Sequence, residues 1–190
     1  MPDKDAHLRW KELSRRTLAS SAVFDLLAVD RTSPGGQRGE FWILNARDWV
    51  TVVPLVSTPE GQPSFLMVRQ YRHGADAITT EFPSGLVERG EDPAAAAARE
   101  LREETGHRAT RLTLVSSLRP NPAFMTNRSF TFVAEDLEDD GALSLDELES
   151  LDVLTLPVEE VYARAGSGEL VNAMTIVALM EYQRYRAERR

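Results

Sequence analysis

The sequence predicts a fold of the α/β (α+β) class, and three observations predict it. Short β-prone runs follow one another from Trp10 to Val56 and return beyond residue 110. An alanine-rich stretch, Pro93 to Thr105, has helix start and stop signals at its two ends. A further helical pattern closes the chain from Asn172 onward. A chain of 190 residues can bury a hydrophobic core, and this length suggests one domain with at most a small one appended.

The first β-prone runs predict a small antiparallel sheet in the N-terminal part of the chain. They cover residues 22–29, 40–44 and 49–56. The stretch 31–39, which contains Ser-Pro-Gly-Gly, is a turn signal between the first two runs.

Strands and helices then alternate with loops. Strands are expected at residues 65–71, near 81–82, and at 111–118, 129–134 and 153–156. A proline-rich loop covers 119–127, and an acidic segment covers 135–152. Helices are expected at 158–164 and from Asn172 to the basic C-terminal end, with Asn172 as the N-cap.

The central helix is the most strongly signalled element. Asp92 is the expected N-cap and Pro93 the first helical residue, while Gly106 is the expected stop. The small and apolar side chains at three- and four-residue spacing predict the buried face, which comprises Ala94, Ala97, Ala98, Leu101 and Thr105.

Carboxylates gather on a neighbouring face of this helix. Glu100, Glu103 and Glu104 are three and four residues apart and therefore lie close together. Arg99 can pair with Glu103, but it cannot compensate all three charges. A hard divalent cation can, and oxygen donors without cysteine or clustered histidine suit Mg²⁺ or Mn²⁺. The alternative is an acidic helix face that is simply solvated.

Composition narrows the classes of partner. The formal net charge of -8 argues against binding duplex nucleic acid, because lysine and arginine neutralise phosphates in such complexes. No apolar run approaches the length needed to span a bilayer, and the first residues lack the hydrophobic region of a signal peptide. There is no cysteine, which excludes disulfides, thiolate metal sites and cysteine nucleophiles. We therefore expect a cytoplasmic protein with no membrane partner.

The central stretch resembles a known family motif. The residues Gly85, Glu91, Arg99, Glu100, Leu101, Glu103, Glu104 and Gly106 stand at the spacing of the Nudix box. Nudix hydrolases cleave nucleoside diphosphates linked to another moiety. The departure from the pattern is His107, where the family usually has an aliphatic residue, and this affects packing after the helix more than chemistry.

The order of elements resembles the ADP-ribose pyrophosphatase branch of this family over nearly the whole chain. The resemblance implies an α/β/α sandwich around a mixed sheet for residues 46–190, the catalytic domain. It also implies an N-terminal β subdomain, residues 1–45, that is exchanged across a homodimer.

The resemblance implies a metal site on the box. Glu100 and Glu104 would bind Mg²⁺ or Mn²⁺ together with the backbone carbonyl of Ser84, and Glu103 lies beside them as a ligand or catalytic group. Such cations are also needed because an acidic site otherwise repels a pyrophosphate. Arg99 and Glu91 would orient the glutamates through ion pairs.

The remaining site residues are also implied by the resemblance. In the segment LSLDELESLD, Glu147 and Glu149 match a loop that supplies a general base and a further metal ligand, the alternative being a solvated acidic loop. Arg72 matches a phosphate-binding arginine after a strand, with a surface salt bridge as the alternative. Glu81 matches a position near the substrate, with a structural ion pair as the alternative.

The resemblance implies hydrolysis of the pyrophosphate of a nucleoside diphosphate sugar, with ADP-ribose favoured. Pro122 stands where the branch has a characteristic proline, but Asn127 and Arg128 stand where it often has a carboxylate. Other small nucleoside diphosphate derivatives, a GDP-sugar or a nucleoside triphosphate therefore stay open. A non-catalytic module that senses a nucleotide is the alternative from another class.

Overall fold

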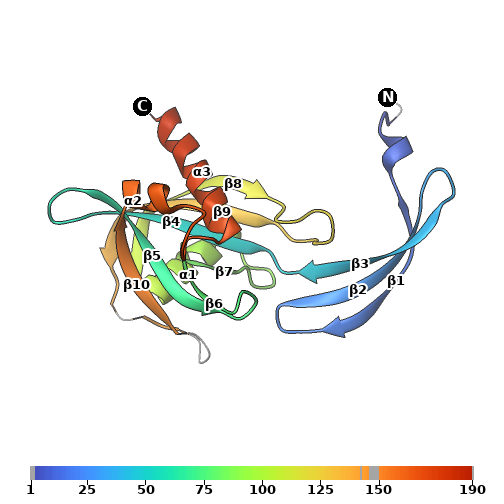
Figure 1. Cartoon of the computed structure of the whole chain (residues 1–190), viewed down its shortest axis with the longest axis horizontal. Helices are drawn as coiled ribbons and strands as arrows, with labels where there is room; N and C mark the ends of the chain where they lie inside the picture. The colour runs from blue at the N-terminus through green and yellow to red at the C-terminus, as the bar shows by residue number, and fades with distance from the viewer. Residues whose placement is uncertain (1–2, 142, 146–149, 190) are drawn as a thin grey trace. The chain divides into compact units, whose positions relative to one another are not determined.

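The computed structural model describes residues 3–141, 143–145 and 150–189. The chain divides into two compact units, Met1–Arg47 with Arg119–Arg128, and Asp48–Leu118 with Ser129–Arg190. Figure 1 labels the helices and strands.

The first unit is built on an antiparallel sheet with the strand order β1-β2-β3. Its strands are β1 (Lys11–Ser20), β2 (Phe24–Thr32) and β3 (Arg38–Ala46), preceded by the 3-10 turn η1 (Ala6–Leu8). The predicted small antiparallel N-terminal sheet is confirmed. The loop Arg119–Arg128 joins this unit through backbone hydrogen bonds, in which Leu44 donates to Phe124 and Thr126 donates to Leu44.

The second unit contains a mixed sheet, seven-stranded within the described residues, with the main order β10-β5-β4-β9-β8. Its strands are β4 (Trp49–Ser57), β5 (Pro63–Arg72), β6 (Ala77–Glu81), β7 (Ser84–Leu86), β8 (His107–Leu118), β9 (Ser129–Asp139) and β10 (Leu151–Pro157). Strands β4 and β9 are parallel, whereas β5, β6, β8 and β10 pair antiparallel with their neighbours. The short strand β7 pairs with β4.

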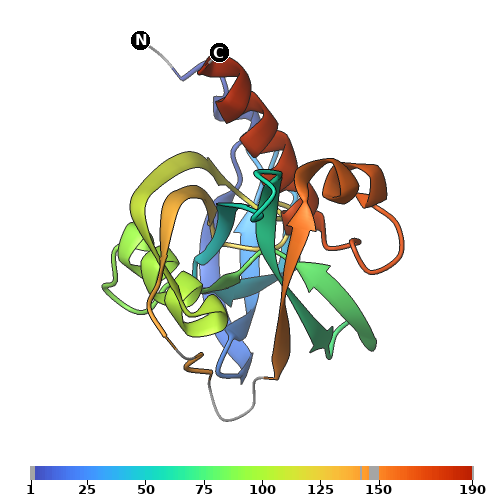
Figure 2. The same ribbon diagram turned by 90° about the vertical axis from the view of Figure 1, so that its left-hand side faces the viewer.

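Helices cover both faces of this sheet, as the resemblance implied. The helix α1 (Pro93–Thr105) packs with Val50, Val52 and Phe132. Helices α2 (Val158–Arg164) and α3 (Ala173–Glu188) share the other core cluster with Val53 and Val133. Successive strand residues point to opposite faces, so α1 lies across the sheet from α2 and α3. Figure 2 shows α1 in yellow-green on one side of the strands and α2 in orange on the other.

The helix α1 has the predicted ends. The Asp92 side chain accepts hydrogen bonds from the amides of Ala94 and Ala95, and Pro93 opens the helix. Gly106 ends it in the left-handed conformation, with φ of 68°, which glycine adopts without steric cost.

The predicted buried face of α1 is partly wrong. Ala97, Leu101 and Thr105 are buried, but Ala98 is exposed, and Ala96 and Glu104 are buried in addition. The buried stripe is therefore rotated toward the carboxylates. The physical reason is tertiary, because the Glu104 carboxylate has a hydrogen-bond donor in β7.

Strands β8 and β9 extend further than predicted. They continue as an antiparallel pair to His107 and Asp139, so the first part of the segment read as an acidic loop is a strand. Charged pairs across the two strands make this extension polar; for example, Arg108 Nη2 lies 2.6 Å from Glu138 Oε2. A search for alternating apolar residues therefore does not detect it. In the described ranges, none of the helices has the length and apolar character needed to cross a membrane.

Candidate active site

Glycine at position 85 lets a glutamate of α1 lie directly against β7. A Cβ atom on Gly85 would stand 2.0 Å from Oε1 of Glu100, far inside van der Waals contact. No side chain could therefore be added there without moving Glu100. The glycine of the box thus makes room for a carboxylate.

Glu104 approaches the same strand one turn later on α1. Its side chain is buried, and Oε2 accepts a hydrogen bond of 2.9 Å from the backbone amide of Ser84. Ser84 and Gly85 are held in place because β7 pairs with Thr51 and Val50 of β4. The structure therefore brings together the predicted residues Ser84, Glu100 and Glu104.

Arg99 contacts more carboxylates than the sequence suggested. Its Nη1 donates to Glu100 at 2.8 Å and to Glu103 at 3.0 Å, while Nε and Nη2 donate to Glu91 at 3.0 and 3.1 Å. Nη2 also donates to the Leu86 carbonyl at 3.0 Å. Arg99 therefore pairs with Glu103, as expected, and also with Glu100, since a planar guanidinium can bridge several acceptors at once.

This network affects protonation. The hydrogen bonds from Arg99 lower the pKa of Glu91, although the partial burial of Glu91 opposes the shift. In turn, the hydrogen bond to Glu91, together with those to Glu100 and Glu103, raises the pKa of Arg99 despite burial. The glutamates therefore face a permanent positive charge.

The donor set suits a hard divalent cation in its chemistry. Only carboxylate and carbonyl oxygens are offered, as Mg²⁺ and Mn²⁺ prefer. Among residues 3–141, 143–145 and 150–189, however, no three acidic or histidine side chains converge on one point. Glu100 and Glu103 are bonded to Arg99, so an arriving cation would compete with Arg99 for these carboxylates.

Arg72 of β5 and Glu81 of β6 form an ion pair. Arg72 Nε and Nη2 donate to the two carboxylate oxygens of Glu81 at 3.0 and 2.7 Å, and Thr79 donates to Oε1 at 2.6 Å. Glu81 is 1% exposed, whereas 39% of the Arg72 side chain is exposed. Burial raises the pKa of Glu81, but the bonds from Arg72 and Thr79 outweigh it and hold the pKa below its usual value.

The alternatives given in the sequence analysis, a salt bridge for Arg72 and an ion pair for Glu81, are both observed. The ion pairs considered for Arg72 and for Glu81 exist, and they are with each other. The buried carboxylate fixes a half-exposed guanidinium, which leaves part of Arg72 open to solvent.

A related clamp was not predicted. Glu169, from the segment between α2 and α3, accepts from Arg69 Nε and Nη2 at 2.8 and 2.9 Å. The Thr80 hydroxyl also donates to the Glu169 side chain, and the Thr80 amide donates to the Glu169 carbonyl at 2.9 Å. The bonds from Arg69 and Thr80 lower the pKa of Glu169 to about 2. No local signal links residues that are 100 positions apart.

Comparison with known proteins identifies this arrangement. The family model described as the NUDIX domain matches residues 47–174, which include β4 to α1 and both ion pairs described above. The chain belongs to the Nudix family. It is a Nudix hydrolase, and the motif that carries the glutamates of α1 is its Nudix box.

Relatives of the whole chain point to one branch. The chain is 32% identical over 177 residues to an ADP-ribose pyrophosphatase of Bacillus subtilis, covering 93% of this chain and 94% of the relative. It is 28% identical over 174 residues to a methanol dehydrogenase activator of Bacillus methanolicus, covering 91% and 92%. A solved structure of an ADP compounds hydrolase matches with a TM-score of 0.83 and 26% identity, covering 95% of this chain and 96% of the other.

The two remaining predicted residues of the Nudix site, Glu147 and Glu149, lie outside the described residues. The described part of the same segment reaches α1, because the Ser144 amide donates to the Glu103 carbonyl at 3.0 Å.

Proposed function

We propose that this Nudix pyrophosphatase hydrolyses the pyrophosphate bond of a nucleoside diphosphate sugar, with ADP-ribose as the favoured substrate. The products would be a nucleoside monophosphate and a sugar phosphate. The observation that carries the proposal is the packing of Glu100 against Gly85 beside Glu104, which is bonded to Ser84. The names of the Bacillus subtilis relative and of the matching solved structure support an ADP compound.

We propose Mg²⁺ or Mn²⁺ as the cofactor, held by Glu100, Glu104 and the Ser84 carbonyl with Glu103 beside them. When bound, such a cation neutralises charge on the pyrophosphate oxygens. The oxygen-only donor set and the acidity of the chain support this assignment. Arg99 and Glu91 would keep the glutamates oriented, since one guanidinium bonds to Glu91, Glu100 and Glu103.

Hydrolysis also needs a group that takes a proton from the attacking water. We propose Glu147 or Glu149 for this role, with Glu149 as a further metal ligand and Glu103 as an alternative catalytic carboxylate. The bond from Ser144 to Glu103 supports a position of this segment near the box.

Arg72 is the proposed contact to a substrate phosphate, and Glu81 is its positioning partner near the substrate. Two hydrogen bonds to a buried carboxylate already order this guanidinium. It therefore loses little further conformational freedom when a phosphate binds. The Arg72 side chain is 39% exposed, so a phosphate in solution can reach it.

A homodimer is the proposed assembly, through the first unit. This unit exposes several large apolar side chains, with Leu8 at 66%, Trp42 at 59% and Leu13 at 47% exposure. Apolar surface of this kind on a small sheet favours a protein interface. Sedimentation of the full chain at micromolar concentration should give twice the monomer mass of 21.2 kDa, and a monomer would contradict the assembly.

The function is tested with a substrate panel in the presence of Mg²⁺. ADP-ribose, a GDP-sugar and a nucleoside triphosphate are incubated with the full chain, and the products are separated by chromatography. We expect AMP and ribose 5-phosphate from ADP-ribose at the highest kcat/KM. Faster turnover of either competitor would reassign the substrate. Ligand-induced thermal stabilisation without any product would instead support the nucleotide-sensing alternative.

A further inference from the structure

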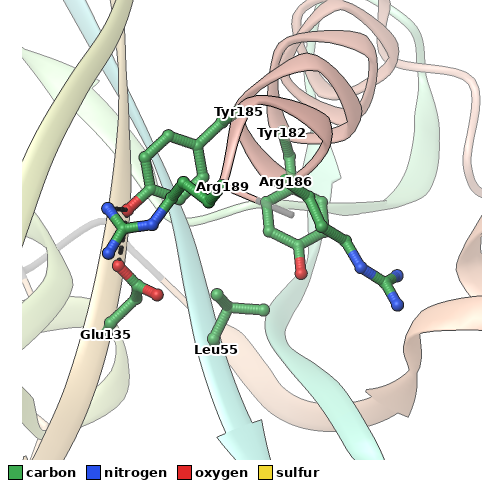
Figure 3. A pocket seen from close by; sticks show the side chains of 6 residues that line it. All are labelled: Leu55, Glu135, Tyr182, Tyr185, Arg186 and Arg189. Carbon is green, nitrogen blue, oxygen red and sulfur yellow. Dashed lines mark hydrogen bonds between the residues drawn. The ribbon is translucent and has the colours of Figure 1, made fainter.

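A polar pocket lies on the face of the larger sheet that α3 covers. It has a volume of about 250 Å³ and is lined by Leu55, Glu135, Tyr182, Tyr185, Arg186 and Arg189. Figure 3 shows these side chains around the last turns of α3. Leu55 packs against the core cluster that includes Val53 and α3, whereas Val50 and Val52 pack with α1. The pocket therefore opens across the sheet from the Nudix box.

One half of this pocket is internally satisfied. Glu135 Oε2 accepts from the Tyr185 hydroxyl at 2.6 Å and from Arg111 Nε at 2.9 Å. Arg189 Nη1 donates to the Tyr185 hydroxyl at 2.6 Å, and its guanidinium lies 4.9 Å from the ring centroid of Tyr185. The single carboxylate in the lining is thus neutralised by Arg111, so it does not cancel the charges of the pocket arginines.

The other half offers donors that have no acceptor among the described residues. Tyr182 is only 6% exposed, yet within the described part of the chain its hydroxyl makes no hydrogen bond. Arg186 has no carboxylate within 4.0 Å among the same residues, although Glu159 lines the neighbouring pocket with it. In Figure 3 the Tyr182 hydroxyl and the Arg186 guanidinium extend to the same side of α3, above and beside Leu55. The hydroxyl oxygen of Tyr182 is not fully enclosed by protein, so it opens to the pocket and can donate to a ligand there.

We propose that this pocket binds a phosphate group, either inorganic phosphate or the end of a small phosphomonoester. The oxygens would accept from the Arg186 guanidinium and the Tyr182 hydroxyl, with Arg189 as a second positive charge. Arginine and hydroxyl donors suit an oxyanion with several acceptor oxygens, and the volume accommodates a small one. The attraction is local, since the chain as a whole carries a net charge of -8.

This site is independent of the proposed reaction. It uses residues of β4, β9 and α3, whereas the proposed catalytic residues described here belong to β5, β6, β7 and α1. A phosphate bound only to the folded chain raises its thermal midpoint, and the midpoint keeps rising with the logarithm of the phosphate concentration once that exceeds Kd.

The test measures thermal unfolding of the full chain in a chelator, with rising inorganic phosphate or ribose 5-phosphate at constant ionic strength. The wild type should show a rise in Tm that follows single-site binding and that chloride does not reproduce. Tyr182→Phe, which removes one oxygen, and Arg186→Gln should each raise the Kd obtained from this rise at least about tenfold. Arg184→Gln is the matched control on the same helix, because Arg184 pairs with Glu181 and does not line the pocket.

The outcomes separate this pocket from the Nudix site. Loss of the phosphate effect in Tyr182→Phe and Arg186→Gln, with retention in Arg184→Gln and Arg72→Gln, supports the proposal. Retention in both pocket variants, or loss in Arg72→Gln alone, overturns it. Within a positive result, a lower Kd for ribose 5-phosphate than for phosphate identifies the ester as the better ligand.

Discussion

The carboxylate of Glu104 is bonded to the backbone amide of Ser84, so the last turn of the box helix is attached to the strand that precedes the box loop. The bond needs only an acceptor, and a glutamine Oε1 can supply one. A substitution by glutamine therefore removes the charge of Glu104 and keeps its hydrogen bond to Ser84.

Glu104→Gln should abolish turnover while it leaves the fold intact. We expect kcat for ADP-ribose to fall at least about a hundredfold, because a charged metal ligand is lost. The thermal midpoint should change little, since the amide can still accept from Ser84. Glu138→Gln, at an exposed ion pair of β9, is the charge-matched control and should retain full activity. Normal turnover in Glu104→Gln would contradict the proposed site.

Gly85→Ala should displace Glu100. The added methyl group would lie 2.0 Å from Oε1 of Glu100, so the carboxylate or the strand must move. Because the atom in contact is the end of a flexible side chain, we expect the free energy of unfolding to change little, whereas kcat should fall because Glu100 is displaced.

Gly74→Ala is the matched control for this substitution. A Cβ on Gly74 meets nothing within 4 Å, so its denaturation midpoint and kcat should stay near those of the wild type. If the two alanine variants behave alike in urea unfolding and in turnover, the close approach at Gly85 has no functional role.

The sequence predicts α1 with correct ends because the signals are local. Asp92, Pro93 and Gly106 act on the backbone within one turn, so no tertiary information is needed. The burial of Glu104 is different, since it depends on a donor in β7 that lies 20 residues away. That strand covers only Ser84–Leu86 and has no readable period.

In the candidate site, too, the sequence predicts what local signals determine and misses what tertiary contacts determine. The family spacing names Arg72 and Glu81 separately, but nothing in the sequence shows that they bind each other. In the register of β5 with β6, Arg72 lies opposite Ala77 and Val68 lies opposite Glu81, so the two long side chains must reach along the same face of the ladder to meet. The Arg69 and Glu169 clamp is still more remote in sequence and could be found only in the folded chain.

Arg72→Gln should cost both stability and substrate affinity. It leaves the buried Glu81 carboxylate without its cationic partner, which we expect to lower the free energy of unfolding by roughly 1–3 kcal/mol. The KM for ADP-ribose should rise because a phosphate contact is lost.

The double variant Arg72→Gln with Glu81→Gln distinguishes the two effects. Without a buried charge the stability should recover in part, whereas the raised KM should persist. If KM returns to the wild-type value together with stability, Arg72 is a structural residue only. Urea denaturation and steady-state kinetics on the same preparations give both readouts.

Glu169 should make stability depend on acid pH. Its folded-state pKa of about 2 lies below the ordinary 4.5, so the clamp contributes stability that is fully present above about pH 4.5 and is lost as the pH falls toward 2. Glu169→Gln should therefore have a lower Tm than the wild type at pH 7, and the difference should shrink as the pH falls below 4.5.

Because half-exposed ion pairs are screened, added salt should also reduce the difference in Tm between the wild type and Glu169→Gln at pH 7. Glu160→Gln, at an exposed ion pair on α2, is the control and should show no comparable change with pH. A difference between wild type and Glu169→Gln that stays constant from pH 7 to pH 3 would show that the Arg69 pair does not depend on the charge of Glu169.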